Sequence, residues 1–396
     1  MRSLLLFLLA CVAIPLFVSA ASAATAADEV AVALLRVPDG GIQPQVGFSE
    51  KGTLHLVYFR GDPAHGNLLY VRSADGGANF SKPLQVNSRD GSAIALGTIR
   101  GARLAIGRGD RVHVAWMGSN LAEPKAPGNL APMLYARLND AGSAFEPQRN
   151  LIQRHPGLDG GGAVAADGQG NVYVAWHAPD IPRTGEAARR VWAATSSDDG
   201  KTFADEIPAI GEPTGACACC GMALLADPSG RLFALYRTAT NIVDRDTCLL
   251  VSDDRAATFK ATRIGPMRLG KCIMSSPALA SGGSAQTPIV LAGWETRGQV
   301  YWAIVGNENS QAISPIPAPG SSGNRKYPAL AVNASGEVLM AWTEGMAWEQ
   351  GGSLAWQIFD ANGRPLPGRA GHAPNVPMWD LPAAFVRPDG SFAIIY

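Results

Sequence analysis

The stretch that decides the fold is ARLAIGRGDRVHVAW, residues 102–116. It holds two short apolar runs, separated by a turn built from Gly and Asp, and it ends on an aromatic residue. Runs of four to six residues with β-branched or aromatic side chains, bounded by turn residues, are typical of β-strands. The stretch therefore predicts two successive strands.

The same phrase recurs seven times along the chain. The copies end, at intervals of 48 to 60 residues, on Tyr58, Trp116, Trp176, Tyr236, Trp294, Trp342 and Tyr396. In the second copy we expect four strands, over residues 104–106, 112–116, 133–138 and 148–152. A repeat of this length made of short strands predicts a ring of small sheets.

Four antiparallel strands per repeat predict an all-β fold, a β-propeller of four-stranded blades. Counting the first strands favours seven blades, with six blades and a C-terminal appendage as the alternative. The last copy stops at Tyr396, after its second strand. We expect the segment 30–37 to pair with residues 392–396, which would close the ring and remove an open sheet edge.

The first residues have the composition of an export signal. Arg2 precedes an apolar run over residues 4–18, and Ala21-Ser-Ala23 fits a cleavage site. We therefore expect a signal peptide over residues 1–23, a single domain over 24–396, and a periplasmic or extracellular location. No other stretch is long and apolar enough to suggest a membrane span.

The charge balance bears on the partners. The 33 basic and 33 acidic residues give a formal net charge of zero. This argues against a nucleic-acid or anionic-membrane partner held by bulk charge. A small molecule or a glycan is the ligand we expect, and a monomer is the expected state.

A second motif recurs between the third and fourth strands. Two full copies are SADGGANF (73–80) and SSDDGKTF (196–203), and a third, SDDRAATF (252–259), has Ala256 in place of Gly. Ser and Asp side chains in such turns bond nearby backbone amides, Gly permits the bend, and the aromatic residue packs between sheets. The residues we assign to these turns are Ser73, Asp75, Gly77, Phe80, Ser196, Asp198, Gly200 and Phe203.

This octapeptide resembles the Asp box, or BNR repeat, of sialidases (neuraminidases), and the resemblance covers most of the chain after the signal. It implies a sialidase-like propeller in which the boxes lie on the face opposite the active site. It further implies a glycoside hydrolase of acidic sugars, with arginines for the substrate carboxylate, a Tyr–Glu nucleophile pair and an Asp acid. The family's first arginine corresponds to Gln43 here, a departure from the family pattern.

The phase of the repeat predicts which residues meet. The start of each first strand and the end of each second strand should lie at one end of the ring, at the mouth of the central channel. For a hydrolase, Tyr327 with Glu295 is the expected nucleophile pair and Asp159 or Asp180 the acid. The residues expected to bind substrate are Arg100, Arg237, Arg325, Lys326 and His177.

Cysteines form the sharpest pattern. The segments TGACACCGM (214–222) and CIMSSP (272–277) begin neighbouring repeats, so the phase predicts that Cys217, Cys219, Cys220 and Cys272 meet at the mouth. Three explanations stay open: a structural disulfide from Cys272 to the cluster, a copper or zinc site, and a redox thiol. Removal of the signal peptide leaves five cysteines, an odd number, so one thiol is left unpaired or metal-bound unless a partner chain pairs it. We expect Cys248, which lies in an apolar strand, to be a core residue.

Two functions of different class follow from these patterns. One is an exported hydrolase of acidic sugars. The other is a non-catalytic propeller that binds a ligand or a metal at the cysteine cluster, with copper or zinc as the indicated cofactor.

Overall fold

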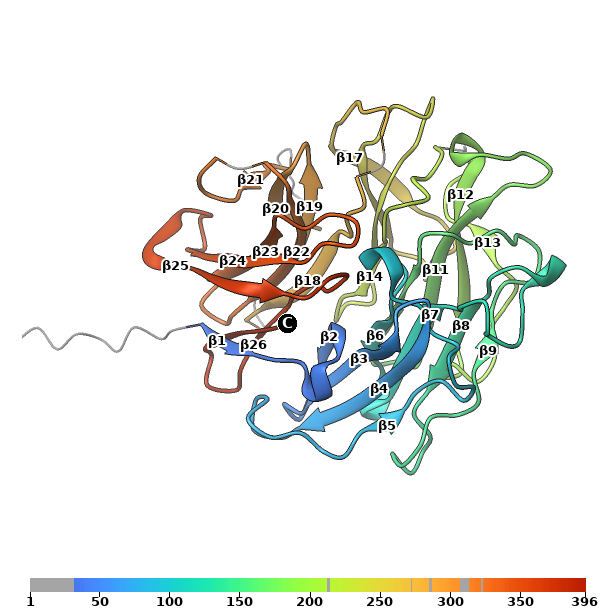
Figure 1. The fold of residues 1–396 in the computed structure, drawn as a ribbon, viewed down its shortest axis with the longest axis horizontal. Helices are drawn as coiled ribbons and strands as arrows, with labels where there is room; N and C mark the ends of the chain where they lie inside the picture. The colour runs from blue at the N-terminus through green and yellow to red at the C-terminus, as the bar shows by residue number, and fades with distance from the viewer. Residues whose placement is uncertain (1–31, 212–213, 272, 285–286, 307–312, 322) are drawn as a thin grey trace, which may run out of the picture. The chain divides into compact units, whose positions relative to one another are not determined.

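The computed structural model describes residues 32–211, 214–271, 273–284, 287–306, 313–321 and 323–396. Six four-stranded sheets and one three-stranded sheet follow one another along the chain, and they stand around a common centre (Figure 1). The predicted seven-bladed β-propeller is confirmed, and the six-bladed alternative is wrong.

Each of the first six blades runs from its inner to its outer strand in chain order, with antiparallel neighbours. The strands are, for blade 1, β2 (Ile42–Phe48), β3 (Leu54–Asp62), β4 (His65–Ser73) and β5 (Leu84–Gln85); for blade 2, β6 (Arg103–Ile106), β7 (Val112–Met117), β8 (Met133–Arg137) and β9 (Arg149–Asn150); and for blade 3, β10 (Gly162–Ala166), β11 (Val172–Pro179), β12 (Arg189–Ser196) and β13 (Ile207–Pro208). They continue, for blade 4, with β14 (Ala223–Ala226), β15 (Leu232–Arg237), β16 (Thr247–Ser252) and β17 (Lys260–Gly265); for blade 5, with β18 (Ala278–Gly283), β19 (Pro288–Thr296), β20 (Gln299–Val305) and β21 (Ile316–Pro317); and for blade 6, with β22 (Arg325–Val332), β23 (Val338–Glu344), β24 (Gly352–Phe359) and β25 (Pro365–Val376).

Blade 7 joins the two ends of the domain. It consists of β26 (Ala383–Val386), β27 (Phe392–Ile395) and β1 (Ala33–Leu35), and β1 pairs in parallel with β27. Ala33 lies opposite Ala393 and Leu35 opposite Ile395. The predicted closure is confirmed, because the N-terminal strand covers the edge that β27 would otherwise leave open.

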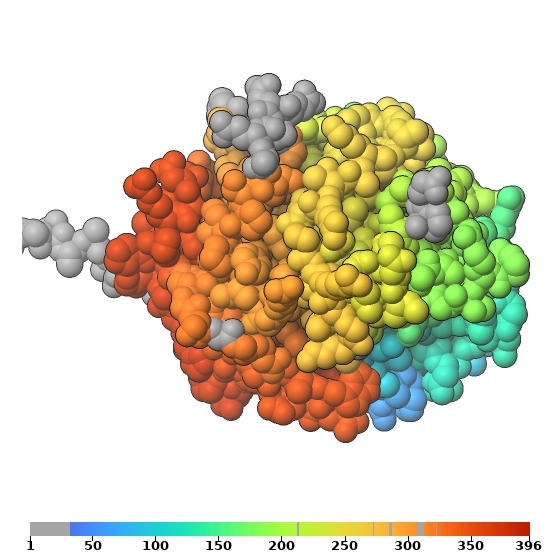
Figure 2. All heavy atoms as spheres, turned by 90° about the horizontal axis from the view of Figure 1, so that it is seen from above, coloured from blue at the N-terminus to red at the C-terminus, as the bar shows by residue number. Residues whose placement is uncertain are grey.

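The repeated aromatic residues hold the blades together. Trp116, Trp176 and Trp294 are at most 1% exposed, because each packs in an apolar layer between neighbouring sheets. In Figure 2, chain segments that follow one another in sequence lie next to one another on the surface, from orange through yellow to green. Within the described residues the helices are three-residue 3₁₀ turns, and none is long and apolar enough to cross a membrane.

The three Asp-box turns share one hydrogen-bond pattern. In the second, Ser196 Oγ donates to Asp198 Oδ1 (2.7 Å) and accepts from the Gly200 amide (3.0 Å), while Asp198 Oδ1 accepts from the Thr202 amide (2.9 Å). The first and third boxes repeat these bonds. Ala256 keeps the pattern by adopting a φ of +67°, a conformation that suits glycine better.

Candidate functional site

The inner strands surround a central cavity of about 630 Å³. Small apolar side chains line most of it, and Arg103 is the one charged residue among the described residues of the lining. Its Nε donates to the Met222 carbonyl (3.3 Å), and burial lowers the pKa of its guanidinium to about 10. The channel is thus apolar, and the polar chemistry lies at its mouth.

Backbone strain gathers at that mouth. Non-glycine residues with positive φ occur at or just before the inner strands of five blades, at Gln43 (57°), Thr98 (60°), Met274 (50°), Tyr327 (51°) and Trp379 (61°). Such conformations cost about 1–3 kcal/mol each and concentrate at functional sites. The mouth is therefore where a binding or catalytic role is most expected.

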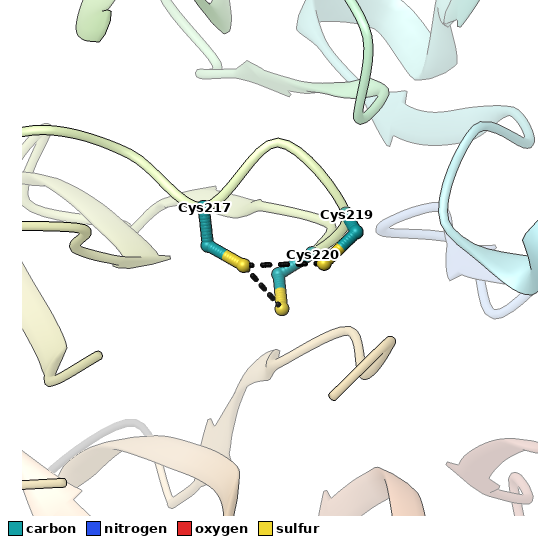
Figure 3. Close-up of side chains that lie close together, drawn as sticks. All are labelled: Cys217, Cys219 and Cys220. Atoms are coloured by element: carbon teal, nitrogen blue, oxygen red, sulfur yellow. Dashed lines mark hydrogen bonds between the residues drawn. The ribbon is translucent and has the colours of Figure 1, made fainter. Parts of the chain in front are cut away.

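Three cysteine sulfurs converge there (Figure 3). Cys217, Cys219 and Cys220 lie in the loop before β14, and their Sγ atoms all lie within 4.8 Å of one another. Cys217 Sγ is 3.4 Å from Cys219 Sγ and 3.3 Å from Cys220 Sγ. The turn between Cys217 and Cys220, closed by a backbone bond of 3.3 Å, lets these side chains share one side despite their adjacency.

Charges and dipoles around the cluster favour a thiolate. The hydrogen bond from the Cys217 thiol lowers the pKa of Cys220, and the Ser275 amide and Arg237 act in the same direction. The same bond, together with burial, raises the pKa of Cys217. Cys220 is thus the sulfur that ionises first, and a thiolate is the form that binds metals and attacks electrophiles.

The cysteine loop is held by a second layer of polar groups. Glu186 accepts from the Ala218 amide (2.8 Å) and from Arg245 Nη2 (2.6 Å). His177 is 1% exposed; its Nδ1 accepts from Arg189 Nε (3.1 Å), so Nε2 carries the proton donated to the Cys220 carbonyl (3.3 Å). Burial lowers the pKa of His177 to about 3, which keeps it neutral.

The oxidation states within the cluster differ. Cys217, Cys220 and the core residue Cys248 are free thiols, whereas Cys219 is disulfide-bonded. The fourth cysteine predicted for the cluster, Cys272, lies outside the described residues. The structure thus brings together three of the four predicted cysteines and combines a disulfide sulfur with two neighbouring thiols.

The cations predicted to bind substrate are engaged by protein groups. Arg100 Nη2 pairs with Asp159 Oδ1 at 2.7 Å. Arg325 Nε pairs with Glu344 Oε1 at 2.9 Å, and its Nη1 donates to the Pro319 carbonyl at 2.8 Å. Both guanidinium groups are therefore already paired.

Both residues of the predicted nucleophile pair have other partners. Glu295 Oε2 accepts from Arg237 Nη2 (3.1 Å) and Oε1 accepts from the Gly298 amide (2.5 Å). Tyr327 is 6% exposed and bonds Thr98, and burial raises the pKa of both Tyr327 and Glu295. Lys326 lies near Glu295 and Cys220, and burial lowers its pKa. Among the described residues, no hydrogen bond joins Tyr327 to Glu295.

Gln43, which the resemblance to sialidases places at the position of their first arginine, is buried, and its side-chain amide bonds neighbouring segments. Its Nε2 donates to the carbonyls of Ala95 (2.7 Å) and Trp379 (2.8 Å). Its backbone amide donates to Asp380 Oδ1 (2.6 Å), and burial raises the pKa of Asp380 to about 7. A substrate carboxylate would find no donor here unless these bonds broke.

Three residues that support the cysteine loop were not predicted from the sequence: Arg189, Glu186 and Arg245. The phase of the repeat could have placed Arg189 at the mouth, because Arg189 begins β12 opposite Pro179, at the mouth end of β11. Glu186 begins the 3₁₀ turn Glu186–Ala188, and Arg245 lies in the loop between β15 and β16. Neither segment follows the strand repeat, so the phase of the repeat does not predict where their side chains lie.

Comparisons with known proteins support the fold. No protein-family model matches the chain, and no curated protein matches it by sequence. Among solved structures, a protein of unknown function from Dyadobacter fermentans matches at 17% identity and a TM-score of 0.53, over 83% of this chain and 96% of that one.

Two of the similar structures are glycosidases. A Penicillium chrysogenum α-L-arabinanase matches at 13% identity and a TM-score of 0.51, over 83% of this chain and 95% of that one. A Hadza microbial sialidase matches at 13% identity and a TM-score of 0.55, over 82% and 66%. The chain therefore has the propeller fold shared by sialidases and arabinanases, and at these identities the likeness concerns the fold alone.

Proposed function

We propose that this protein is an exported, non-hydrolytic propeller that binds a soft metal ion, copper(I) or zinc, through the cysteine cluster at its channel mouth. The observation that carries the proposal is the convergence of three cysteine Sγ atoms within 4.8 Å of one another. Thiolates are the preferred ligands of both metals.

The electrostatic surroundings support this proposal. Arg237 and the Ser275 amide favour the Cys220 thiolate. Metal binding requires deprotonated thiols. Two thiols are available as they stand, and reduction of the Cys219 disulfide would supply the third ligand.

The test is a copper(I) titration under anaerobic conditions, against a chromophoric copper(I) chelator, with the protein reduced beforehand. We expect one copper per chain, with retention lost in Cys217→Ser and in Cys220→Ser. Cys248→Ser is the matched control, because Cys248 is a buried free cysteine in the core of blade 4. The proposal is contradicted if all three variants retain copper equally. It is also contradicted if the wild type binds neither copper nor zinc.

Export is a separate part of the proposal, motivated by residues 1–23. N-terminal sequencing of protein from the periplasmic fraction should find the chain beginning near residue 24. A full-length chain found only in the cytoplasm contradicts export.

A second candidate function is hydrolysis of an acidic sugar, favoured by the similarity in fold to a sialidase and an arabinanase. It would require the Arg237–Glu295 and Arg100–Asp159 pairs to open for substrate. Turnover of a fluorogenic sialoside that is lost in Glu295→Gln would support it. Absence of turnover across pH and added metals removes this candidate.

A further inference from the structure

Blades 1 and 2 carry the same trio of side chains at the Asp-box end, far along the strands from the cysteine cluster. In both, a histidine Nδ1 lies 2.7 Å from a tyrosine hydroxyl, with the two rings inclined by 22°. An arginine follows two residues after each tyrosine. The trios are His55, Tyr70 and Arg72 in blade 1, and His113, Tyr135 and Arg137 in blade 2.

In blade 2, two carboxylates balance the arginine. Glu146 accepts from Arg137 Nε (2.8 Å) and Nη2 (2.7 Å). Asp199, from the Asp box of blade 3, places Oδ2 3.6 Å from Arg137 Nη1 and Oδ1 3.7 Å from His113 Nε2. A neighbouring blade thus fills the trio of blade 2 with a carboxylate.

In blade 1, both carboxylates are missing. Ser81 replaces Glu146: the Ser81 amide donates to the Arg72 carbonyl at 2.9 Å, as the Glu146 amide does to that of Arg137. Ala141 of blade 2 takes the sequence position that Asp199 has in the box of blade 3. Among the described residues, the Arg72 guanidinium has no carboxylate partner.

The space left open is a cavity of about 700 Å³, which we name the blade-1 slot. Its lining includes His55, Tyr70, Arg72, Ser81 and Ala141. His55 is 5% exposed, and its Nε2, like the Nε2 of His113 in blade 2, has no hydrogen-bond partner. A buried polar atom without a partner costs about 1–3 kcal/mol, so a ligand that bonds it is stabilised.

Acidic side chains of the lining already have partners. Asp75 bonds Ser73 and Asn79 within its box. Asp140 pairs with Arg111, and Asp110 Oδ2 lies 3.7 Å from Lys51 Nζ. Arg72 is therefore the cation of the slot whose charge is not balanced by a paired acid.

We propose that the blade-1 slot binds a small carboxylate ligand, which takes the place that the Asp199 carboxylate has beside blade 2. Arg72 would hold the carboxylate by charge-assisted hydrogen bonds, and His55 Nε2 would bond the same ligand. This proposal is independent of the metal site, because the slot and the cysteine cluster lie at opposite ends of the blades.

The test is isothermal titration of the full protein with succinate, and with the uncharged succinamide as the matched probe. We expect succinate binding at millimolar concentration or tighter, no succinamide binding, and a loss of at least about tenfold in Arg72→Gln. Arg364→Gln, an exposed arginine of blade 6, is the control and should bind succinate as the wild type does.

A second variant restores the blade 2 pattern. Ser81→Glu should give Arg72 an internal carboxylate, raise the thermal midpoint and abolish succinate binding, whereas the neutral Ser81→Gln should retain binding within about threefold. Absence of wild-type succinate binding, binding unchanged in both Arg72→Gln and Ser81→Glu, or equal binding of succinamide overturns the proposal. Succinate binding that is seen only in crystals at high succinate concentration would also count against the proposal.

Discussion

Asp380 offers a quantitative test of how the mouth is built. Its side chain is fully buried, with Oδ1 accepting from the amides of Gln43 (2.6 Å) and Leu381 (2.8 Å), while Oδ2 has no partner among the described residues. Burial raises its pKa from 3.8 to about 7. We therefore predict that Asp380→Asn removes a destabilisation that grows with pH.

Well below pH 3.8 the carboxyl group of Asp380 is protonated in both the folded and the unfolded state. As the pH rises the unfolded chain ionises first, so the free energy of unfolding falls until the pH passes the pKa of the folded state. At about 1.4 kcal/mol per pKa unit, the free energy of unfolding of the wild type should fall by roughly 2–3 kcal/mol relative to Asp380→Asn between pH 5 and pH 8.

Urea unfolding followed by tryptophan fluorescence at the two pH values measures this difference. Asp389→Asn is the control, because hydrogen bonds from Ser391 lower the pKa of the exposed Asp389 below its ordinary value. Its carboxyl group is therefore ionised in both the folded and the unfolded state at the two pH values, and the difference in stability between the wild type and Asp389→Asn should not change. If the difference between the wild type and Asp380→Asn does not change with pH, the reasoning about the buried carboxyl is refuted.

Three further predictions concern stability. Ala256→Gly should raise the free energy of unfolding by about 0.5–1 kcal/mol, because Ala256 holds a φ of +67°; a decrease in urea unfolding would contradict this. Ser196→Ala should cost roughly 1–2 kcal/mol by leaving the Gly200 amide without its acceptor, and an unchanged urea midpoint would show that the Asp-box bond contributes nothing. Arg237→Leu should cost about 3–5 kcal/mol at pH 8, because Glu295 is left as a buried, unpaired charge; the cost should shrink as the pH falls, because burial raises the pKa of Glu295 and protonation removes that charge, and a cost independent of pH would argue against the pair.

The fold was predictable because its determinants are periodic. Trp116, Trp176 and Trp294 mark the same buried position in successive blades, and the unclaimed N-terminal segment had one free edge to pair with. Cys217, Cys219 and Cys220 lie within four residues of one another in the sequence, and a turn brings their sulfurs together. The contact that the phase of the repeat predicts, with Cys272, lies outside the described residues.

Side-chain pairing within the mouth was not predictable. Arg325 lies at the right place in the repeat, but its guanidinium turns toward Glu344 and the Pro319 carbonyl. Tyr327 is turned by a φ of +51° at a bulge in β22 and bonds Thr98. The phase of the repeat predicts where in a blade a residue lies. Rotamers and local backbone strain decide which groups its side chain contacts.

The proposed metal site depends on the cysteine thiols at the channel mouth. X-ray absorption spectroscopy of the reduced, copper(I)-loaded protein identifies the atoms bound to the metal. We expect a first coordination shell of sulfur alone, which disappears in the Cys217→Ser, Cys220→Ser double variant and persists in Cys248→Ser. A shell of nitrogen or oxygen ligands, or a sulfur shell that survives in the double variant, would contradict it.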